Sequence, residues 1–154
     1  MKVTEFLSPN AVVAELHGTT KAEVLRELSE LLGRAYPQAL RADRVLEVLA
    51  EREKLASTGI GDGVAIPHGK MPGLDKLYAA FGVSRAGVEF QSIDKRPTHL
   101  FFALLAPENS AGVHLKALAR VSRLFRNPEL RTSILAAADA DSMYRLISEE
   151  DSRT

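Results

Sequence analysis

Apolar residues recur along the first third of the chain with two different spacings. Residues 11–16 form a short apolar run that ends at a histidine and a glycine, a pattern typical of a strand. From 21 to 35, valine and leucine return every three or four positions, which predicts a helix. Thr19 or Thr20 can cap its first turn. The same spacing returns from 41 to 55, where we expect a second helix.

The middle of the chain is richer in extended segments. After a glycine-rich loop, residues 63–67, 77–84 and 98–106 are predicted as strands. Residues 100–105 are apolar at every position, as expected of a strand covered on both faces, so this strand is predicted at the centre of the sheet. Helical spacing then predicts three further helices, at 113–126, from Pro128 onward, and at 141–149.

Helices before and after a largely apolar sheet indicate one layered α/β domain. The chain has 154 residues, which is enough for one hydrophobic core and short for two domains. Its 45% hydrophobic and 26% charged residues are typical of globular proteins. No apolar run reaches the ~18 residues of a membrane span, and the N-terminus does not resemble a signal peptide. No membrane insertion is expected.

Charge and cysteine content exclude several kinds of chemistry. Basic and acidic residues both number 20, so the formal net charge is zero. A neutral chain offers no broad attraction to nucleic acid, and we expect no nucleic-acid partner. The absence of cysteine excludes disulfides, thiolate catalysis and cysteine-bound metals, and it favours a cytoplasmic location.

The strongest candidate for chemistry is His68, which lies between Pro67 and Gly69 at the end of the glycine-rich loop. A neutral imidazole is a nucleophile at physiological pH, and a hydrogen bond to one ring nitrogen selects the tautomer that leaves the other free. Pro67 restricts the backbone before it, and Gly69 has no side chain to obstruct an approaching group. We therefore expect His68 to act as a nucleophile toward an anionic partner.

A transferred phosphoryl group needs hydrogen-bond donors and positive charge around that imidazole. The hydroxyls of Ser57 and Thr58 and the backbone amides of the loop, including that of Gly69, are suitable donors. Arg52, on the preceding helix, can add a bidentate cation. His114 lies at the start of a predicted helix, where free amides and the helix dipole favour an anion. This arrangement needs neither a metal nor a cofactor.

Less specific interpretations stay open for these residues. A single loop histidine is more often a surface residue than a nucleophile, and Arg52 with Glu51 and Glu53 could form surface ion pairs. The loop matches neither the dinucleotide fingerprint nor the P-loop pattern, so a nucleotide is not implied. His17 and His99 are assigned no role. A solvated face opposite the leucines of the 113–126 helix is expected for Lys116, Arg120 and Arg123.

Two segments resemble the signatures of one protein family. Residues 51–70, which contain Pro67-His68-Gly69, are similar to the signature of the fructose/mannitol-type EIIA proteins of the bacterial phosphotransferase system. Residues 104–115, which end in His114-Leu115, resemble the family's second signature in the matching order. The similarity extends from about residue 4 to 148. It implies a single EIIA domain, 4–148, built as a three-layer α/β/α sandwich with a central mixed sheet.

The resemblance also implies a role for each matching residue. His68 corresponds to the histidine that takes a phosphoryl group on Nε2 from the small carrier HPr and passes it to an EIIB partner or acts as a phosphorylation-dependent regulator. His114 and Arg52 correspond to the residues that support the phosphate. Asp62 stands where relatives often have asparagine. Because a carboxylate would repel an incoming phosphate, we expect Asp62 to face solvent.

Within the family, the chain looks most like the nitrogen-regulatory EIIA proteins, whose targets include a kinase and potassium transport. A sugar-specific EIIA that passes the group to an EIIB is the main alternative. Two further classes remain: an interaction module with a vestigial histidine, and a hydrolase that uses His68 as a general base. The last is least favoured, because no serine, cysteine or carboxylate lies in a recognisable nucleophile motif.

Overall fold

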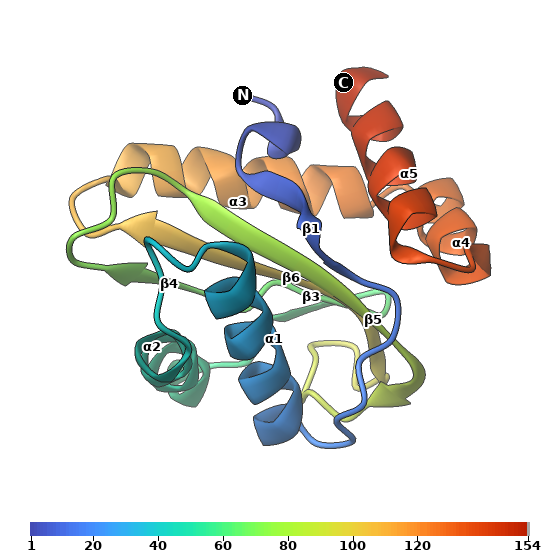
Figure 1. Cartoon of the computed structure of the whole chain (residues 1–154). Helices are drawn as coiled ribbons and strands as arrows, with labels where there is room; N and C mark the ends of the chain where they lie inside the picture. Colours follow the sequence, from blue (N-terminus) through green and yellow to red (C-terminus); the bar gives the residue numbers. More distant parts are fainter. Residues whose placement is uncertain (154) are drawn as a thin grey trace.

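The structure is a computed structural model that describes residues 1–153, and these form one 3-10 helix, six strands and five α-helices (Figure 1). In chain order the elements are η1 (Val3–Glu5), β1 (Leu7–Val13), α1 (Lys21–Ala35), α2 (Ala42–Leu55), β2 (Gly59–Gly61), β3 (Val64–Ala65), β4 (His68–Met71), β5 (Tyr78–Val88), β6 (Thr98–Pro107), α3 (Ala111–Phe125), α4 (Pro128–Ala136) and α5 (Ala140–Arg153).

The strands form one mixed sheet in the order β1-β5-β6-β3-β2, and β4 also pairs with β6. β5 runs antiparallel to β6, whereas β3 and β4 run parallel to it. β6 is therefore covered along both edges, and its residues 100–106 are all buried. The predicted central position of this strand is confirmed.

Helices cover both faces of the sheet. On one face, Phe102 of β6 and Phe81 of β5 pack against Phe125 of α3, with ring centroids 5.9 and 5.4 Å from it. On the other face, Phe101 makes an edge contact with Phe90 at 5.2 Å, and α1 and α2 lie over this side (Figure 1). The predicted α/β/α sandwich with a mixed central sheet is confirmed.

The helix α1 has the bounds that the spacing of apolar residues predicts, and Thr20 caps it by accepting a hydrogen bond from the Glu23 amide at 3.2 Å. The strand predicted at 11–16 is wrong in its bounds, since β1 is Leu7–Val13. Its register on β5 shifts between Leu7 and Val12, around two exposed residues that hide the strand pattern. Leu16 is buried just beyond the strand end.

The expected polar and apolar faces of α3 are also partly wrong. Leu115 is 67% exposed, and the side of α3 that faces the sheet instead carries Ala117 and Val121. Arg120 is not solvated, because its Nη2 lies 2.8 Å from Oδ1 of Asp151 near the C-terminal end of α5. Lys116 and Arg123 are exposed as expected. The residues of α3 alone do not reveal this partner, because Asp151 lies 31 residues further along the chain.

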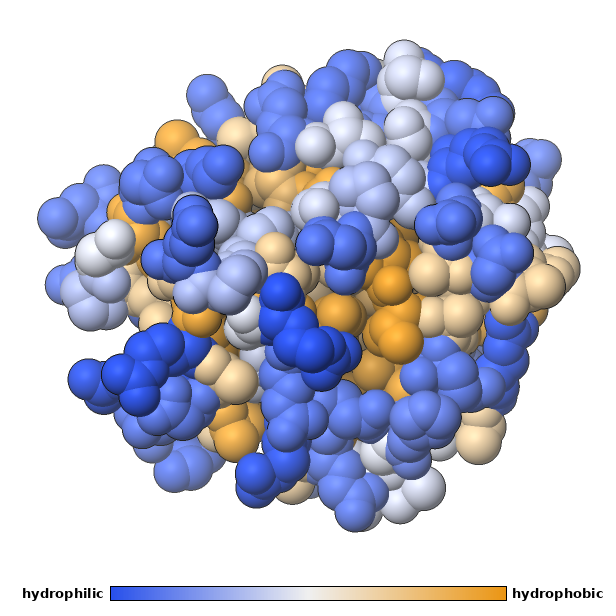
Figure 2. Space-filling view, viewed as in Figure 1, coloured by the Kyte–Doolittle hydropathy of each residue, from blue (hydrophilic) through white to orange (hydrophobic). Residues whose placement is uncertain are grey.

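On the side of the molecule shown in Figure 2, hydrophilic side chains cover most of the surface, and apolar ones appear in narrow strips between them. In residues 1–153 no helix combines the length and apolar character that crossing a bilayer requires.

Candidate active site

The segment that carries His68 is an interrupted strand held along β6. Val64 of β3 lies opposite Leu100 and His68 of β4 lies opposite Leu104, so the spacing is the same on both strands. The strand 63–67 was expected to be continuous and to end before His68. Instead it breaks at Ile66 and Pro67, where the Ile66 amide turns away to Thr58 O at 3.0 Å. His68 is thus the first residue of β4.

This break sets the tautomer of His68. Its Nδ1 lies 2.7 Å from the carbonyl oxygen of Ile66. A carbonyl oxygen can only accept, so Nδ1 carries the proton and donates it, and Nε2 keeps its lone pair. Burial lowers the pKa of His68, and Arg52 lowers it further, against the opposing effects of the Ile66 carbonyl and Glu53. His68 is therefore a neutral nucleophile near neutral pH.

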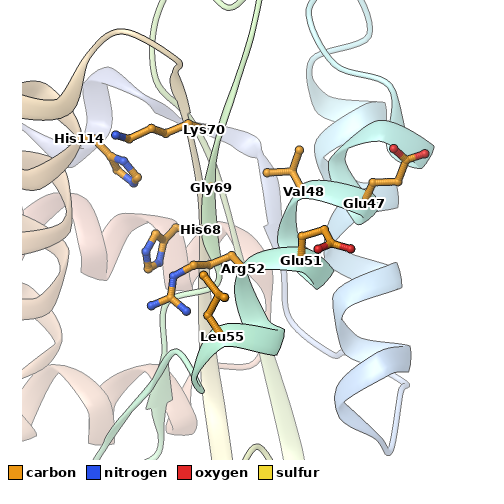
Figure 3. Close-up of a pocket in the computed structure, with 9 residues that line it drawn as sticks. All are labelled: Glu47, Val48, Glu51, Arg52, Leu55, His68, Gly69, Lys70 and His114. Atoms are coloured by element: carbon orange, nitrogen blue, oxygen red, sulfur yellow. The ribbon is translucent and has the colours of Figure 1, made fainter.

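The sheet register directs the His68 side chain toward α3. Opposed residues in a sheet point to the same face, and alternate residues share a face. His68 is opposite Leu104, two residues from the Phe102 that packs on α3. The ring of His68 accordingly meets that of His114 on α3 edge to face, with centroids 5.3 Å apart (Figure 3). The two histidines that the sequence singles out lie in contact.

His114 is the fourth residue of α3, and its environment differs from the expected free helix start. Its amide donates to Ser110 O at 2.8 Å, so that amide is not available to an anion. The side chain is 6% exposed, and within residues 1–153 its Nε2 has no hydrogen-bond partner. Burial lowers the pKa of His114 to about 4, with smaller contributions from the neighbouring His68 imidazole and the Lys70 ammonium. A buried unpaired nitrogen is costly, which suggests that a bound group satisfies it.

Gly69 explains how Arg52 reaches this site. A Cβ on Gly69 would overlap Cγ1 of Val48, so α2 packs directly on the backbone of β4. Arg52 lies one turn beyond Val48 on α2, and its guanidinium lies beside the His68 ring (Figure 3). Its Nη1 donates to Ala56 O at 2.8 Å, and this hydrogen bond fixes the orientation of the guanidinium. The absence of a side chain at Gly69 thus lets α2, which carries Arg52, approach β4 closely.

These residues surround an open cleft of about 700 Å³, which is lined by Glu47, Val48, Glu51, Arg52, Leu55, His68, Gly69, Lys70 and His114. The carboxylates of Glu47 and Glu51 point away from the histidines (Figure 3). They pair with Arg44 at 3.6 Å and Lys54 at 3.1 Å. The inner end of the cleft is therefore formed by two neutral imidazoles and two cations, Arg52 and Lys70, a composition suited to a small anion.

Ser57 and Thr58 do not line this cleft. The Ser57 hydroxyl donates to Phe90 O at 2.6 Å. Thr58 is buried, and its hydroxyl donates to Oε1 of Glu53 at 2.5 Å. Phosphate binding by Ser57 and Thr58 stays a prediction, and it requires both hydroxyls to leave these acceptors.

Glu53 has a different environment from the surface ion pair considered for it. It is 7% exposed, accepts from the Thr58 amide at 2.8 Å and pairs with Lys21 at 3.1 Å. These contacts join α1, α2 and the start of the glycine-rich loop. Arg52, its neighbour, makes no ion pair among the residues described. Glu53 therefore stabilises the fold, whereas its neighbour Arg52 faces the cleft.

Asp62 faces solvent as expected, and the two histidines without an assigned role lie outside the cleft. Asp62 is exposed, and its amide donates to Asp94 Oδ2 at 2.9 Å. His17 is exposed, and His99 Nδ1 lies 3.0 Å from Ser84 O, away from the cleft residues. Sequence reasoning missed Lys70 in the cleft. Its position two residues after His68 was the available signal, because alternate strand residues share a face.

Comparison with known proteins identifies the family. The family described as phosphoenolpyruvate-dependent sugar phosphotransferase system, EIIA 2, matches residues 5–150, and the chain belongs to it. The chain is 40% identical over 148 residues to a nitrogen regulatory protein of Bradyrhizobium diazoefficiens, covering 96% of this chain and 95% of that protein. The expected resemblance is confirmed.

Solved structures agree with this assignment. The nitrogen regulatory protein IIA-Ntr from Neisseria meningitidis superposes with a TM-score of 0.87 and 34% identity, covering 94% of this chain and 98% of that one. The mannitol EIIA of Escherichia coli, solved in complex with its phosphorylated IIB, shares the fold with a TM-score of 0.73 at 19% identity, covering 92% and 96%. The chain is a phosphotransferase-system EIIA component most similar, among these, to nitrogen regulatory proteins.

Proposed function

We propose that this chain is a cytoplasmic phosphoryl carrier in which Nε2 of His68 accepts a phosphoryl group from a phosphohistidine of an HPr-type carrier protein. The observation that carries the proposal is the hydrogen bond from Nδ1 to Ile66 O, which leaves the Nε2 lone pair available beside His114 and Arg52. Membership of the EIIA family supports the same reaction.

The transfer is a direct exchange between two imidazoles. The Nε2 lone pair of His68 forms the new N–P bond, and the electron pair of the broken N–P bond returns to the donor nitrogen. The proton stays on Nδ1, which donates its hydrogen bond to the Ile66 carbonyl throughout. Because the phosphoryl transition state is loose, the protein contributes mainly position and charge. Arg52 stabilises the phosphoryl oxygens, and His114 Nε2 approaches them from the buried side.

The proposed use of the phosphoryl group is regulation. The nitrogen regulatory relative that matches nearly the whole chain is 40% identical, whereas the sugar-specific relatives are 35% identical or less, and this difference favours a protein whose phosphorylation state controls its binding to targets such as a kinase or a potassium transporter. The alternative is delivery to an EIIB in sugar uptake, as in the complex of the E. coli mannitol protein. Loss of the phosphoryl group to a purified EIIB would favour this alternative.

Intact-protein mass spectrometry after incubation with phosphorylated HPr tests the proposal. The wild-type chain should gain one phosphoryl group, and His68→Ala should gain none. His17→Ala is the matched control, because His17 is exposed and lies outside the cleft. Phosphorylation of His68→Ala at the wild-type level would refute the assignment. Target binding that is unchanged in His68→Asp would instead indicate an interaction module with a vestigial histidine.

A further inference from the structure

Lys70 is a cleft residue to which neither the motif nor the family resemblance assigns a role. It lies on β4, opposite Ala106 of β6 and two residues after His68. Alternate residues of a strand point to the same face, so Lys70 shares the α3 side of the sheet with His68, while Gly69 faces α2. Figure 3 shows the Lys70 side chain extending from β4 toward His114.

The ammonium group of Lys70 has no partner among the residues that the structure describes, neither a carboxylate nor a hydrogen-bond acceptor. The two carboxylates of the cleft lie on α2 and already pair with Arg44 and Lys54. The positive charge nevertheless acts within the cleft, since it contributes to lowering the pKa of His114. An exposed, unpaired cation that extends toward His114 at the edge of the cleft is placed to receive an anion.

Two cations are needed to balance the charge of the transferred phosphoryl group. A phosphoryl group carries close to two negative charges at neutral pH. His68 and His114 are neutral, because their pKa values are lowered, and Arg52 supplies one positive charge from the α2 side. Lys70 is the other cation among the cleft residues, and it approaches from the α3 side.

We propose that Lys70 binds the phosphoryl oxygens on His68 from the side opposite Arg52. This proposal rests on the proposed function. In this role Lys70 stabilises phosphorylated His68 relative to the free imidazole. It therefore raises the equilibrium constant for phosphoryl transfer from the HPr-type carrier to this chain. No bond to Lys70 forms or breaks. The residue acts by direct contact with the transferred group.

The equilibrium between phosphorylated HPr and this chain tests the role of Lys70. Lys70→Met should lower the equilibrium constant for phosphoryl acceptance about tenfold, the effect of losing one charge-assisted hydrogen bond. Lys70→Arg should recover most of it, because the charge is kept. Lys116→Met is the matched control, since Lys116 is exposed on α3, is not a cleft residue and carries the same charge.

A spectroscopic readout separates contact from a structural effect. A nearby ammonium lowers the pKa of the phosphoryl oxygens, so the ³¹P resonance of phosphorylated Lys70→Met should titrate at higher pH than that of the wild type and of Lys116→Met. An unchanged equilibrium constant and ³¹P titration in Lys70→Met would overturn the role of Lys70 while leaving the proposed function intact. If the wild-type chain accepts no phosphoryl group, both proposals fail.

Discussion

Replacing Gly69 by alanine tests whether the close approach of α2 to β4 positions Arg52. Gly69 does not have a positive φ, so alanine fits the backbone there. Its Cβ, however, would overlap Cγ1 of Val48. Val48 is β-branched and strongly prefers one rotamer in a helix, so turning aside is unfavourable. α2 must therefore move away from the sheet, and the guanidinium of Arg52 moves with it.

The expected magnitudes follow from the overlap of one methyl group. Overpacking of this kind costs about 1–3 kcal/mol, offset by about 0.4–1 kcal/mol from the reduced freedom of the unfolded chain when glycine becomes alanine. Gly69→Ala should therefore destabilise by roughly 1–2 kcal/mol. Val48→Ala removes the overlapping methyl group. The double variant should then be more stable than the sum of the single effects predicts, with a coupling of about 1 kcal/mol or more.

Urea unfolding followed by far-ultraviolet circular dichroism measures the four members of this cycle, since the chain has no tryptophan for fluorescence. The rate of phosphorylation by HPr provides the functional readout. It should fall in Gly69→Ala and recover in the double variant, because Arg52 returns to His68. Additivity of the two substitutions within ~0.5 kcal/mol would refute direct contact between these residues. Normal rates in a destabilised Gly69→Ala would refute the positioning of Arg52.

Two further predictions concern stability. The pKa of His114 is about 4 in the folded chain and ordinarily 6.5, so between these values the unfolded chain binds more protons and stability falls as the pH is lowered from 6.5 to 4. The expected loss of unfolding free energy is on the order of 3 kcal/mol. Urea unfolding at pH 7 and pH 4.5 measures this loss, which should be smaller in His114→Gln. Equal losses in the wild type and in His114→Gln would contradict the lowered pKa of His114. Arg120→Met leaves the buried Asp151 carboxylate without its guanidinium, so we expect a destabilisation of about 3 kcal/mol. Thermal or urea unfolding measures this loss, and Arg123→Met is the control, because Arg123 is exposed and loses the same charge. Similar midpoints for both variants would show that the ion pair of Arg120 with Asp151 contributes little to stability.

Local signals predicted the helices better than the strands. The bounds of α1 follow from a capping threonine and the spacing of its leucines, both of which lie within the segment itself. The bounds of β1 depend on where β5 offers partners and on a register shift, and neither leaves a trace in residues 11–16. The two short strands β2 and β4 were missed for the same reason, since pairing with distant residues defines them.

The same distinction between local and long-range signals applies to the residues of the candidate site. His68 could be found because proline and glycine flank it, and His114 and Arg52 because they match family signatures. That the two imidazoles touch depends on the register of β4 against β6, which brings His68 under α3. The environments of Thr58 and Glu53, and the unpaired state of Lys70 among the residues described, are properties of the folded chain alone.

The break at Ile66 and Pro67 has a consequence for how this protein can change in length. Both β3 and β4 are aligned on β6 with one common spacing, so an insertion between them must either form a bulge or move one strand along its partner. A shift of β4 by one residue would reverse the orientation of every side chain in it. The imidazole would then point at α2, where the structure has room only for a hydrogen atom. We therefore expect natural insertions in this protein to fall in other loops, and the Ile66-Pro67 step to keep its length wherever the nucleophile is retained.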